Sequence, residues 1–215
     1  MDFIMTLFEL FQHRYDQVWV ALQQHMFLVF VSMGIAIAIA VPVGVFLTGM
    51  RRYAEPVIGV AAVAQTIPSL ALLGFMLPLL GIGTANAIFA LAVYALLPIL
   101  RNTYTGILEV DQSAVQAGKG MGMTRNQILR KIELPLAFPV IMAGIRTSTV
   151  IVIGIATLAT FVGAGGLGDV IMRGLATQQS ALTLLGAIPA AILAIITDFL
   201  LKRLENGVTP RGVKK

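Results

Sequence analysis

The run MFLVFVSMGIAIAIAVPVGVFLT, from Met26 to Thr48, decides the fold class because it contains no charged side chain. A helix needs about 20 mostly apolar residues to cross the hydrocarbon of a bilayer, and this run is long enough. The whole chain agrees with it: 58% of the 215 residues are apolar and 12% are charged, with a mean hydropathy of +0.90. Soluble domains carry about 25% charged residues, so the surplus apolar surface must face lipid.

Four further runs of membrane length follow, and they predict an all-α membrane protein with about five transmembrane helices. The expected spans after the first are residues 57–80, 85–100 with the helix continuing to about 103, 135–162 and 182–201. The second is interrupted by Gln65, Thr66, Pro68 and Ser69. Proline occurs in every run, which predicts kinked helices suited to a moving bundle or a wet passage, although proline is common in membrane helices generally.

Basic residues gather on one side of the expected membrane. Arg51, Arg52, the loop after the third span and the tail of residues 202–215 hold most of the 15 Lys and Arg residues. Because such residues are retained in the cytoplasm, we expect the N-terminus outside and the C-terminal tail inside. The net charge of +5 then reflects membrane topology. The lipid bilayer is an expected partner, and nucleic acid is not.

Residues 1–25 are expected to form an amphipathic outer segment ahead of the membrane domain of residues 26–201. Phe8, Phe11, Tyr15 and Trp19 recur at helical spacing, and these aromatic side chains suit a membrane interface. Three placements stay open: a helix lying on the membrane, an extension of the first span, or a helix packed against its own bundle. Acidic residues in this segment argue against a cleaved secretory signal.

Polar residues within the spans are candidates for a transport pathway. Arg146 is the one basic residue inside an expected span, where charges are costly and often functional; snorkelling towards the cytoplasm is the alternative. Asp198 and Lys202 are expected to form a helical ion pair. The candidates for pathway or gate are Gln65, Pro68, Ser69, Tyr94, Arg146 and Phe161, with Phe75 as a further aromatic. The spans contain no paired acids of the kind that relay protons, which argues against a proton-driven transporter.

The stretch from Gly163 to Gly168 fits the G-x-G-x-x-G pattern but lacks the context of a dinucleotide site, since it follows a membrane-length run on the outer face. We predict a flexible or closely packed outer turn, capped by Asp169; its glycines are Gly163, Gly165, Gly166 and Gly168. The chain has no cysteine and two histidines, His13 and His25, both near the N-terminus. No metal site is expected.

The loop from Asn102 to Leu134 points to a function because it far exceeds the usual ~2–8 residues between bundle helices. It reads as a helix over 111–119, a glycine-containing break over 120–124, a second helix over 125–132, and then Leu134-Pro135. Two short helices would form a compact cytoplasmic protrusion, and such a protrusion suits the groove of a partner.

This loop resembles the EAA motif of importer permeases in the ATP-binding-cassette (ABC) superfamily, which reads E-A-A, three residues, Gly, nine residues, Ile, one residue, Leu-Pro. Gly122, Ile132 and Leu134-Pro135 fall on that pattern, and Ala117 falls on its first alanine. Gln116 replaces the acid, and Gly118 replaces the second alanine. The resemblance assigns ATPase coupling, within a loop of residues 107–136, to Gln116, Ala117, Gly118, Gly122, Met123, Thr124, Ile132, Leu134 and Pro135.

Residues 65–70, 97–106, 144–149 and 163–169 resemble the osmoprotectant branch of these permeases. The resemblance implies a type I importer arrangement, as in methionine importer permeases, in a bacterial cell membrane. It implies a non-enzymatic subunit that forms half of the pathway for a solute such as glycine betaine, carnitine or choline. Its implied partners are cytoplasmic ATPases holding ATP and Mg, a second permease, identical or paralogous, and an extracellular binding protein. The alternatives are a methionine or sulfonate importer, an ion-coupled carrier and a membrane scaffold.

Overall fold

The computed structural model describes residues 2–208, and every regular element in that range is a helix. Six long helices form the body of the molecule: α1 (Asp2–Gly49), α2 (Arg51–Thr66), α3 (Ser69–Leu80), α4 (Thr84–Leu108), α7 (Leu134–Ala156) and α9 (Ser180–Val208). Shorter elements connect them: α5 (Gln112–Gly120), α6 (Arg125–Ile128), the π-helical η1 (Leu129–Glu133), the 3₁₀ helix η2 (Thr157–Val162) and α8 (Leu167–Ala176).

Within the described range, four helices are long and apolar enough to cross a membrane, and α2 with α3 makes a fifth if that bent pair is one span. The predicted all-α membrane architecture is confirmed. The second span is interrupted where the sequence predicts it, between Thr66 and Ser69, and there α2 and α3 meet at 98°. Ile67 is extended (φ −69°, ψ 127°), as expected for a residue that precedes proline.

The other prolines do not break their helices. α1, α4, α7 and α9 continue through Pro42, Pro98, Pro139 and Pro189. Membrane helices tolerate proline when neighbouring helices and hydroxyl side chains satisfy the freed carbonyl groups. The predicted interruption therefore falls at Pro68 alone among these positions.

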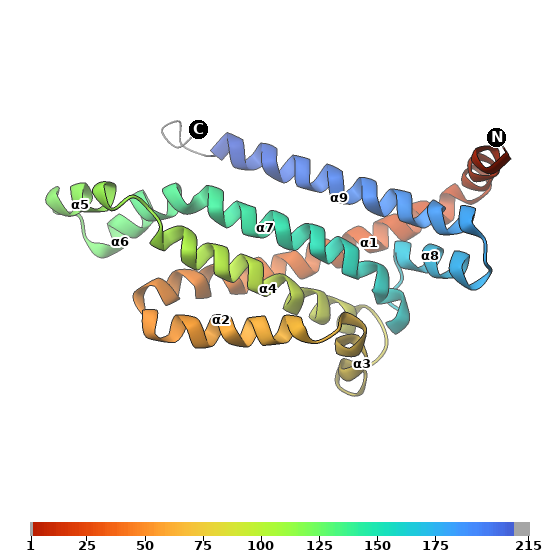
Figure 1. Cartoon of the computed structure of the whole chain (residues 1–215), viewed down its shortest axis with the longest axis horizontal. Coiled ribbons are helices and arrows are strands. Elements are labelled where there is room, and N and C mark those ends of the chain that lie inside the picture. The colour runs from red at the N-terminus through yellow and green to blue at the C-terminus, as the bar shows by residue number, and fades with distance from the viewer. Residues whose placement is uncertain (1, 209–215) are drawn as a thin grey trace.

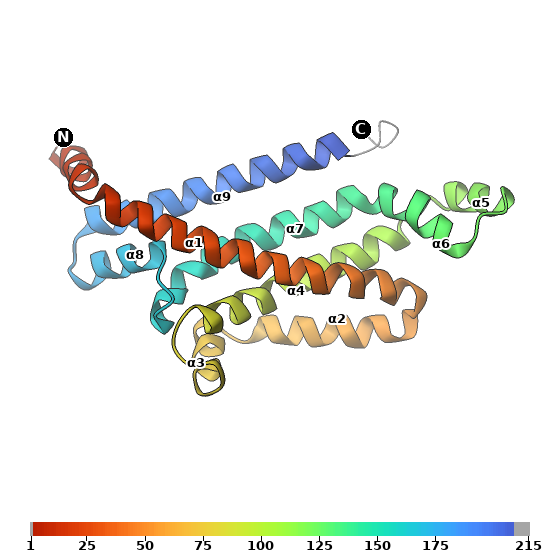
Figure 2. The ribbon, with the colours of Figure 1, turned by 180° about the vertical axis from the view of Figure 1, so that it is seen from behind.

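α4 is the central helix and the most buried of the four spans. It lies between α7 and α2 in Figure 1, and α1 crosses behind it, as Figure 2 shows. Small residues such as Ala87, Ala90 and Ala95 are fully buried on it and let its neighbours approach closely. On α7, a Cβ at Gly144 would lie 2.7 Å from the Pro98 carbonyl oxygen. This close packing forms the core.

The first 25 residues continue the first span. α1 runs from Asp2 to Gly49 and is kinked at Arg14, whose backbone is non-helical (φ −127°, ψ 15°). Val18 and Ala21 are buried in a cluster that includes Leu167 and Leu182, from α8 and α9. Of the three placements left open by the sequence, the structure combines two, an extension of the span and packing against the bundle.

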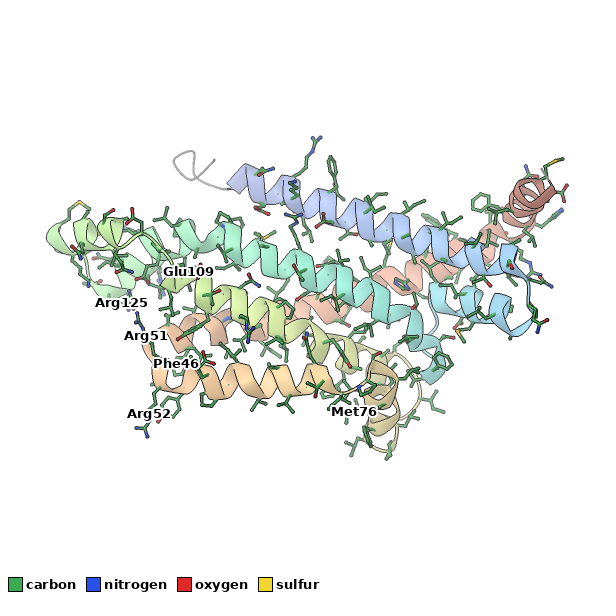
Figure 3. The ribbon with its side chains drawn as sticks, viewed as in Figure 1. Phe46, Arg51, Arg52, Met76, Glu109 and Arg125 are labelled. Atoms are coloured by element: carbon green, nitrogen blue, oxygen red, sulfur yellow. The ribbon has the colours of Figure 1, made fainter. Side chains whose placement is uncertain are left out.

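The two ends of the bundle differ. The N-terminus, α3 and α8 lie at one end, and α5 and α6 project from the other (Figure 1). Arg51, Arg52 and Arg125 lie at the end that carries α5 and α6 (Figure 3). The basic end predicted from the sequence is therefore one physical end of the molecule.

Candidate functional site

The projecting loop is built from two short helices whose ends are well defined. Asp111 caps α5, since its carboxylate accepts hydrogen bonds from the Ser113 amide (2.9 Å) and the Ser113 hydroxyl (2.7 Å). The Ser113 hydroxyl and, after it, the Ser113 amide lower the pKa of Asp111. The carboxylate is therefore charged at neutral pH, at the end of the helix where the macrodipole favours negative charge.

α5 ends in a Schellman motif at Gly122. The Gly122 amide donates to Lys119 O (2.9 Å), and the Met123 amide donates to Gly118 O (3.1 Å). Gly122 has φ +77°, a left-handed conformation that glycine adopts without steric cost. The glycine demanded by the predicted motif is therefore required by the backbone.

α6 starts immediately afterwards in a capping box. The Thr124 hydroxyl accepts from the Gln127 amide (3.4 Å), and the Gln127 side chain accepts from the Thr124 amide (2.8 Å). A Schellman end followed at once by a capping box fixes the angle between two helices that are too short to be stable alone.

The predicted coupling residues divide into an inner and an outer set. Gly118 is buried, and a Cβ there would lie 2.5 Å from Ile132 Cδ1. This contact explains why glycine replaces the second alanine of the motif. Gln116 and Ala117 are exposed on α5, and Met121 beside them is 74% exposed. Met121 was not predicted, although a large apolar side chain between two glycines was a visible signal.

The loop is joined to α7 without an interruption. η1 continues directly from α6 and leads into α7 at Leu134, with Pro135 in its first turn. Arg125 forms an ion pair with Glu133, whose side chain is only 8% exposed. The loop and α7 therefore form one continuous helical path.

Four of the predicted pathway residues meet at the break between α2 and α3. Gln65 Nε2 donates to Tyr94 O (2.6 Å), and the Tyr94 hydroxyl donates to Ile67 O. Pro68 and Ser69 begin α3 at this point. Non-helical backbone at membrane depth requires such partners, because lipid provides none.

Asn86 was missed by the sequence reasoning. Its amide is fully buried and donates to Leu73 O and Gly81 O, at 3.1 Å each. It supports α3 from the start of α4. An asparagine in an apolar run just after Gly81-Ile82-Gly83 was the available signal.

The remaining pathway candidates do not join this cluster. Phe161 in η2 and Phe75 on α3 are 52% and 68% exposed. Arg146 lies on α7 and binds Asp198 and Glu205 of α9. Both Asp198 carboxylate oxygens accept hydrogen bonds from the Arg146 guanidinium, and Lys202, the partner expected from the sequence, also acts on Asp198 as a favourable charge. The snorkelling alternative stays a prediction, because one of the two counter-charges, Glu205, lies towards the C-terminal end of α9.

The glycine-rich outer turn is closely packed. Gly163, Gly165 and Gly166 all have positive φ, and a Cβ at Gly168 would overlap the Thr157 carbonyl oxygen. Gly166 is the residue before α8, and Asp169 joins the two sides of the turn by accepting a hydrogen bond from the Thr160 hydroxyl.

α1 holds this turn through two residues that the sequence reasoning missed. The Gly166 amide donates to Gln24 Oε1 (3.0 Å). His25 is fully buried, and its Nε2 donates to Ile153 O (3.1 Å) on α7. A run of polar residues at the head of an apolar span, Gln23-Gln24-His25, was the signal.

A membrane helix bundle with a rigidly capped loop at its basic end and a side-chain-supported break within a span defines a membrane transport subunit. The chain belongs to the family described as binding-protein-dependent transport system inner membrane component, whose model matches residues 36–210. It is thus the permease component of an ABC transporter and not the ATPase. Membership implies an ATPase and a binding protein as partners, and it excludes the ion-coupled carrier and the scaffold.

Its relatives include osmoprotectant permeases. The chain is 48% identical to the carnitine transport permease protein OpuCB of Listeria monocytogenes, over 100% of this chain and 97% of the relative. It is 51% identical to the glycine betaine/carnitine/choline transport system permease protein OpuCB of Bacillus subtilis, over 89% and 88%. In an inward-facing structure of the MetNI methionine ABC transporter, the matching chain has a TM-score of 0.81 at 26% identity, over 90% and 96%. The predicted helix arrangement, that of a type I importer permease similar to the methionine importer permeases, is confirmed.

Proposed function

We propose that this chain forms half of the translocation pathway of an ATP-driven importer for a compatible solute such as glycine betaine, carnitine or choline. The observation that carries the proposal is the projecting α5–α6 loop, capped at both helix junctions and continuous with α7. The solute class is supported by relatives named for carnitine, choline and glycine betaine transport that are about half identical over most of the chain.

In this proposal the ATPase receives the outward face of α5, with Gln116, Ala117 and Met121 in contact. Gly118 and Ile132 form the inner face that keeps the two short helices together. Closure of the ATPases on ATP and Mg displaces this unit, and the displacement passes through η1 into α7. Packed cores switch between discrete arrangements, so such a shift exchanges inward-open and outward-open packings.

The gate is assigned to the break between α2 and α3. Gln65, Ser69 and Tyr94 lie where the helical backbone is interrupted, and hinges use residues at the ends of such elements. A second permease, identical or paralogous, completes the pathway. The N-terminus and the α8 end face outward, where the binding protein delivers solute, and the basic end faces the cytoplasm.

Reconstitution tests the proposal. The permease is purified with its ATPase, any second permease and the binding protein, and uptake of labelled glycine betaine, carnitine, choline and methionine into proteoliposomes is measured with ATP inside. We expect ATP-dependent uptake of at least one quaternary ammonium solute and none without the binding protein. Uptake of none of the three would refute the solute class, and absence of a co-purifying ATPase would refute the coupling role.

A methionine importer is the second candidate, favoured by the structural similarity to the MetNI transporter; a sulfonate importer stays as a further alternative. Binding to the cognate binding protein separates them. Saturable binding of a quaternary ammonium compound supports the first proposal, and binding of methionine or a sulfonate alone supports an alternative.

A further inference from the structure

Three charged side chains form one cluster between α7 and α9. Arg146 Nε donates to Asp198 Oδ1 (2.9 Å), Nη2 donates to Asp198 Oδ2 (3.1 Å), and Nη1 donates to Glu205 Oε2 (3.1 Å). The contact with Asp198 is bidentate, the geometry in which arginine binds carboxylate most specifically. Two carboxylates that lie about two turns apart on α9 therefore converge on one guanidinium of α7.

α9 is packed less deeply into the bundle than the other spans, although Leu193 and Ala194 contact the core. α9 lies along the outside of the bundle beside α7 (Figures 1 and 2), and it is the least buried of the four spans. An apolar groove of about 570 Å³ separates it from α1 and α7. The groove is lined by Phe30, Met33, Ile145, Thr149, Leu193 and Thr197, among others.

The charged cluster lies between this groove and a second hollow. Ile145 and Thr197, the chain neighbours of Arg146 and Asp198, line the groove. Arg146 and Asp198 themselves line a hollow of about 470 Å³ together with Ala143 and Thr147. With a hollow on each side, the charged side chains add a polar link to the contacts between these two helices. Such a link is directional and breaks when one charge is removed.

α7 is the helix that leads directly from the coupling loop. The helical path from α6 through η1 enters α7 at Leu134, and Arg146 lies further along the same helix. A displacement of the loop therefore reaches Arg146 through one continuous helical segment. Along the chain, α9 is separated from that segment by η2, α8 and their turns.

We propose that Arg146 is the positioning residue that makes α9 move with α7, so that ATPase closure reaches the last span as well as the helix it drives directly. The inference rests on the proposed function and adds a transmission step to it. Asp198 supplies the bidentate contact, and Glu205 supplies a second anchor nearer the C-terminal end of α9.

The test uses the complete reconstituted transporter with the variants Arg146→Gln, Asp198→Asn, Glu205→Gln and the exchange Arg146→Asp with Asp198→Arg. Solute uptake and ATP hydrolysis are measured together. We expect Arg146→Gln to lower the ratio of solute moved to ATP hydrolysed at least 10-fold while ATPase activity persists. The exchange should recover part of that ratio.

Arg203→Gln is the matched control for the loss of an arginine from α9. The Arg203 guanidinium lies over Phe199 of its own helix (4.7 Å to the ring centroid), so this variant should keep the parental ratio.

A distance measurement reports the link directly. The chain has no cysteine, so Ala143→Cys with Leu204→Cys gives one labelled pair across α7 and α9. We expect a single, narrow spin-label distance distribution that is the same without nucleotide and with trapped ATP. Arg146→Gln should broaden the distribution and make it depend on nucleotide.

The outcomes separate this inference from the proposed function. A parental transporter that imports solute, together with an Arg146→Gln variant that keeps the parental transport ratio and the narrow distribution, overturns the inference alone. If Arg146→Gln fails to assemble, Asp198→Asn and Glu205→Gln decide: a lowered ratio in either supports the link, and parental ratios in both overturn it. A parental transporter without ATP-dependent uptake contradicts the proposed function itself.

Discussion

At the residue scale, glycine is required at position 122 for two reasons: the EAA-like motif has glycine there, and the backbone is in a conformation that favours glycine. Its φ of +77° places it in the left-handed region, yet no atom lies within 4 Å of where a Cβ would be. The left-handed backbone conformation, and not a lack of space for a side chain, therefore restricts which residues fit at position 122. A β-branched residue has the highest cost there, and asparagine has a lower one.

We therefore predict that Gly122→Val impairs coupling while Gly122→Asn largely preserves it. The left-handed conformation costs roughly 1–2 kcal/mol for most residues, enough to unfold the end of α5 and shift Met121. ATPase co-purification and ATP-dependent uptake are the measurements. Gly120→Ala is the control, because Gly120 is helical with open space around it. Normal uptake by Gly122→Val would contradict the assigned role of the turn.

At Gly168 the restriction is space, because a Cβ there would overlap the Thr157 carbonyl oxygen. We predict that Gly168→Ala destabilises the protein in detergent by ~1–3 kcal/mol, the range for overpacking. Thermal unfolding followed by circular dichroism measures it. Gly154→Ala, where no atom lies within 4 Å of the added Cβ, should keep or raise the midpoint, because alanine favours a helix interior over glycine. Equal midpoints for both variants would show that α8 can move away from η2.

At the element scale, the broken span depends on side chains of α4. Tyr94 binds the α2 side of the break twice, with its hydroxyl donating to Ile67 O and its carbonyl accepting from Gln65. Asn86 supports the far end of α3 through Leu73 O and Gly81 O. The orientation of α3 is therefore a property of α4 as much as of its own sequence.

Tyr94→Phe should destabilise this element, because it leaves the Ile67 carbonyl without its partner at membrane depth. An unsatisfied buried group costs about 1–3 kcal/mol. We expect a lower unfolding temperature and faster proteolysis or exchange around residues 66–70, measured by hydrogen–deuterium exchange in nanodiscs. Tyr53→Phe is the control, since Tyr53 is exposed on α2. Unchanged exchange at the break in Tyr94→Phe would remove Tyr94 from the gate.

At the scale of the whole molecule, the bundle has a basic end and an opposite end that carries α8. The helices α5 and α6 project at the basic end, beside Arg51 and Arg52 (Figure 3). This arrangement supports the proposed topology, in which the coupling loop is cytoplasmic and the turn after α8 is outside.

Cysteine labelling tests that topology in intact cells. The chain has no cysteine, and both Lys119 and Thr177 are exposed. A membrane-impermeant maleimide added outside should label Thr177→Cys, and it should label Lys119→Cys only after the cells are opened. Labelling of Lys119→Cys in intact cells would invert the orientation and remove the proposed contact with the ATPase.

The membrane class, the approximate spans and the position of the coupling loop could be predicted because they depend on local properties. An uncharged run such as 26–48 has one stable solution in lipid, a helix. The spacing from Gly122 to Ile132 and Leu134-Pro135 is likewise written along the chain. Pro68 marked an interruption, but the chain alone could not say that α3 would turn by 98°, since Tyr94 and Asn86 stabilise that angle from another helix.

The sequence by itself determined that this chain spans a membrane as helices and carries an EAA-like loop, because apolar length and motif spacing act between near neighbours. Only the tertiary structure decided which charges meet. Arg146 and Asp198 are 52 positions apart, and the sequence offered Asp198 a nearer partner in Lys202. Gln24 and Gly166 are 142 positions apart. Pairings over such distances follow from how the helices pack, because a buried charge or amide binds the partner that packing brings within reach.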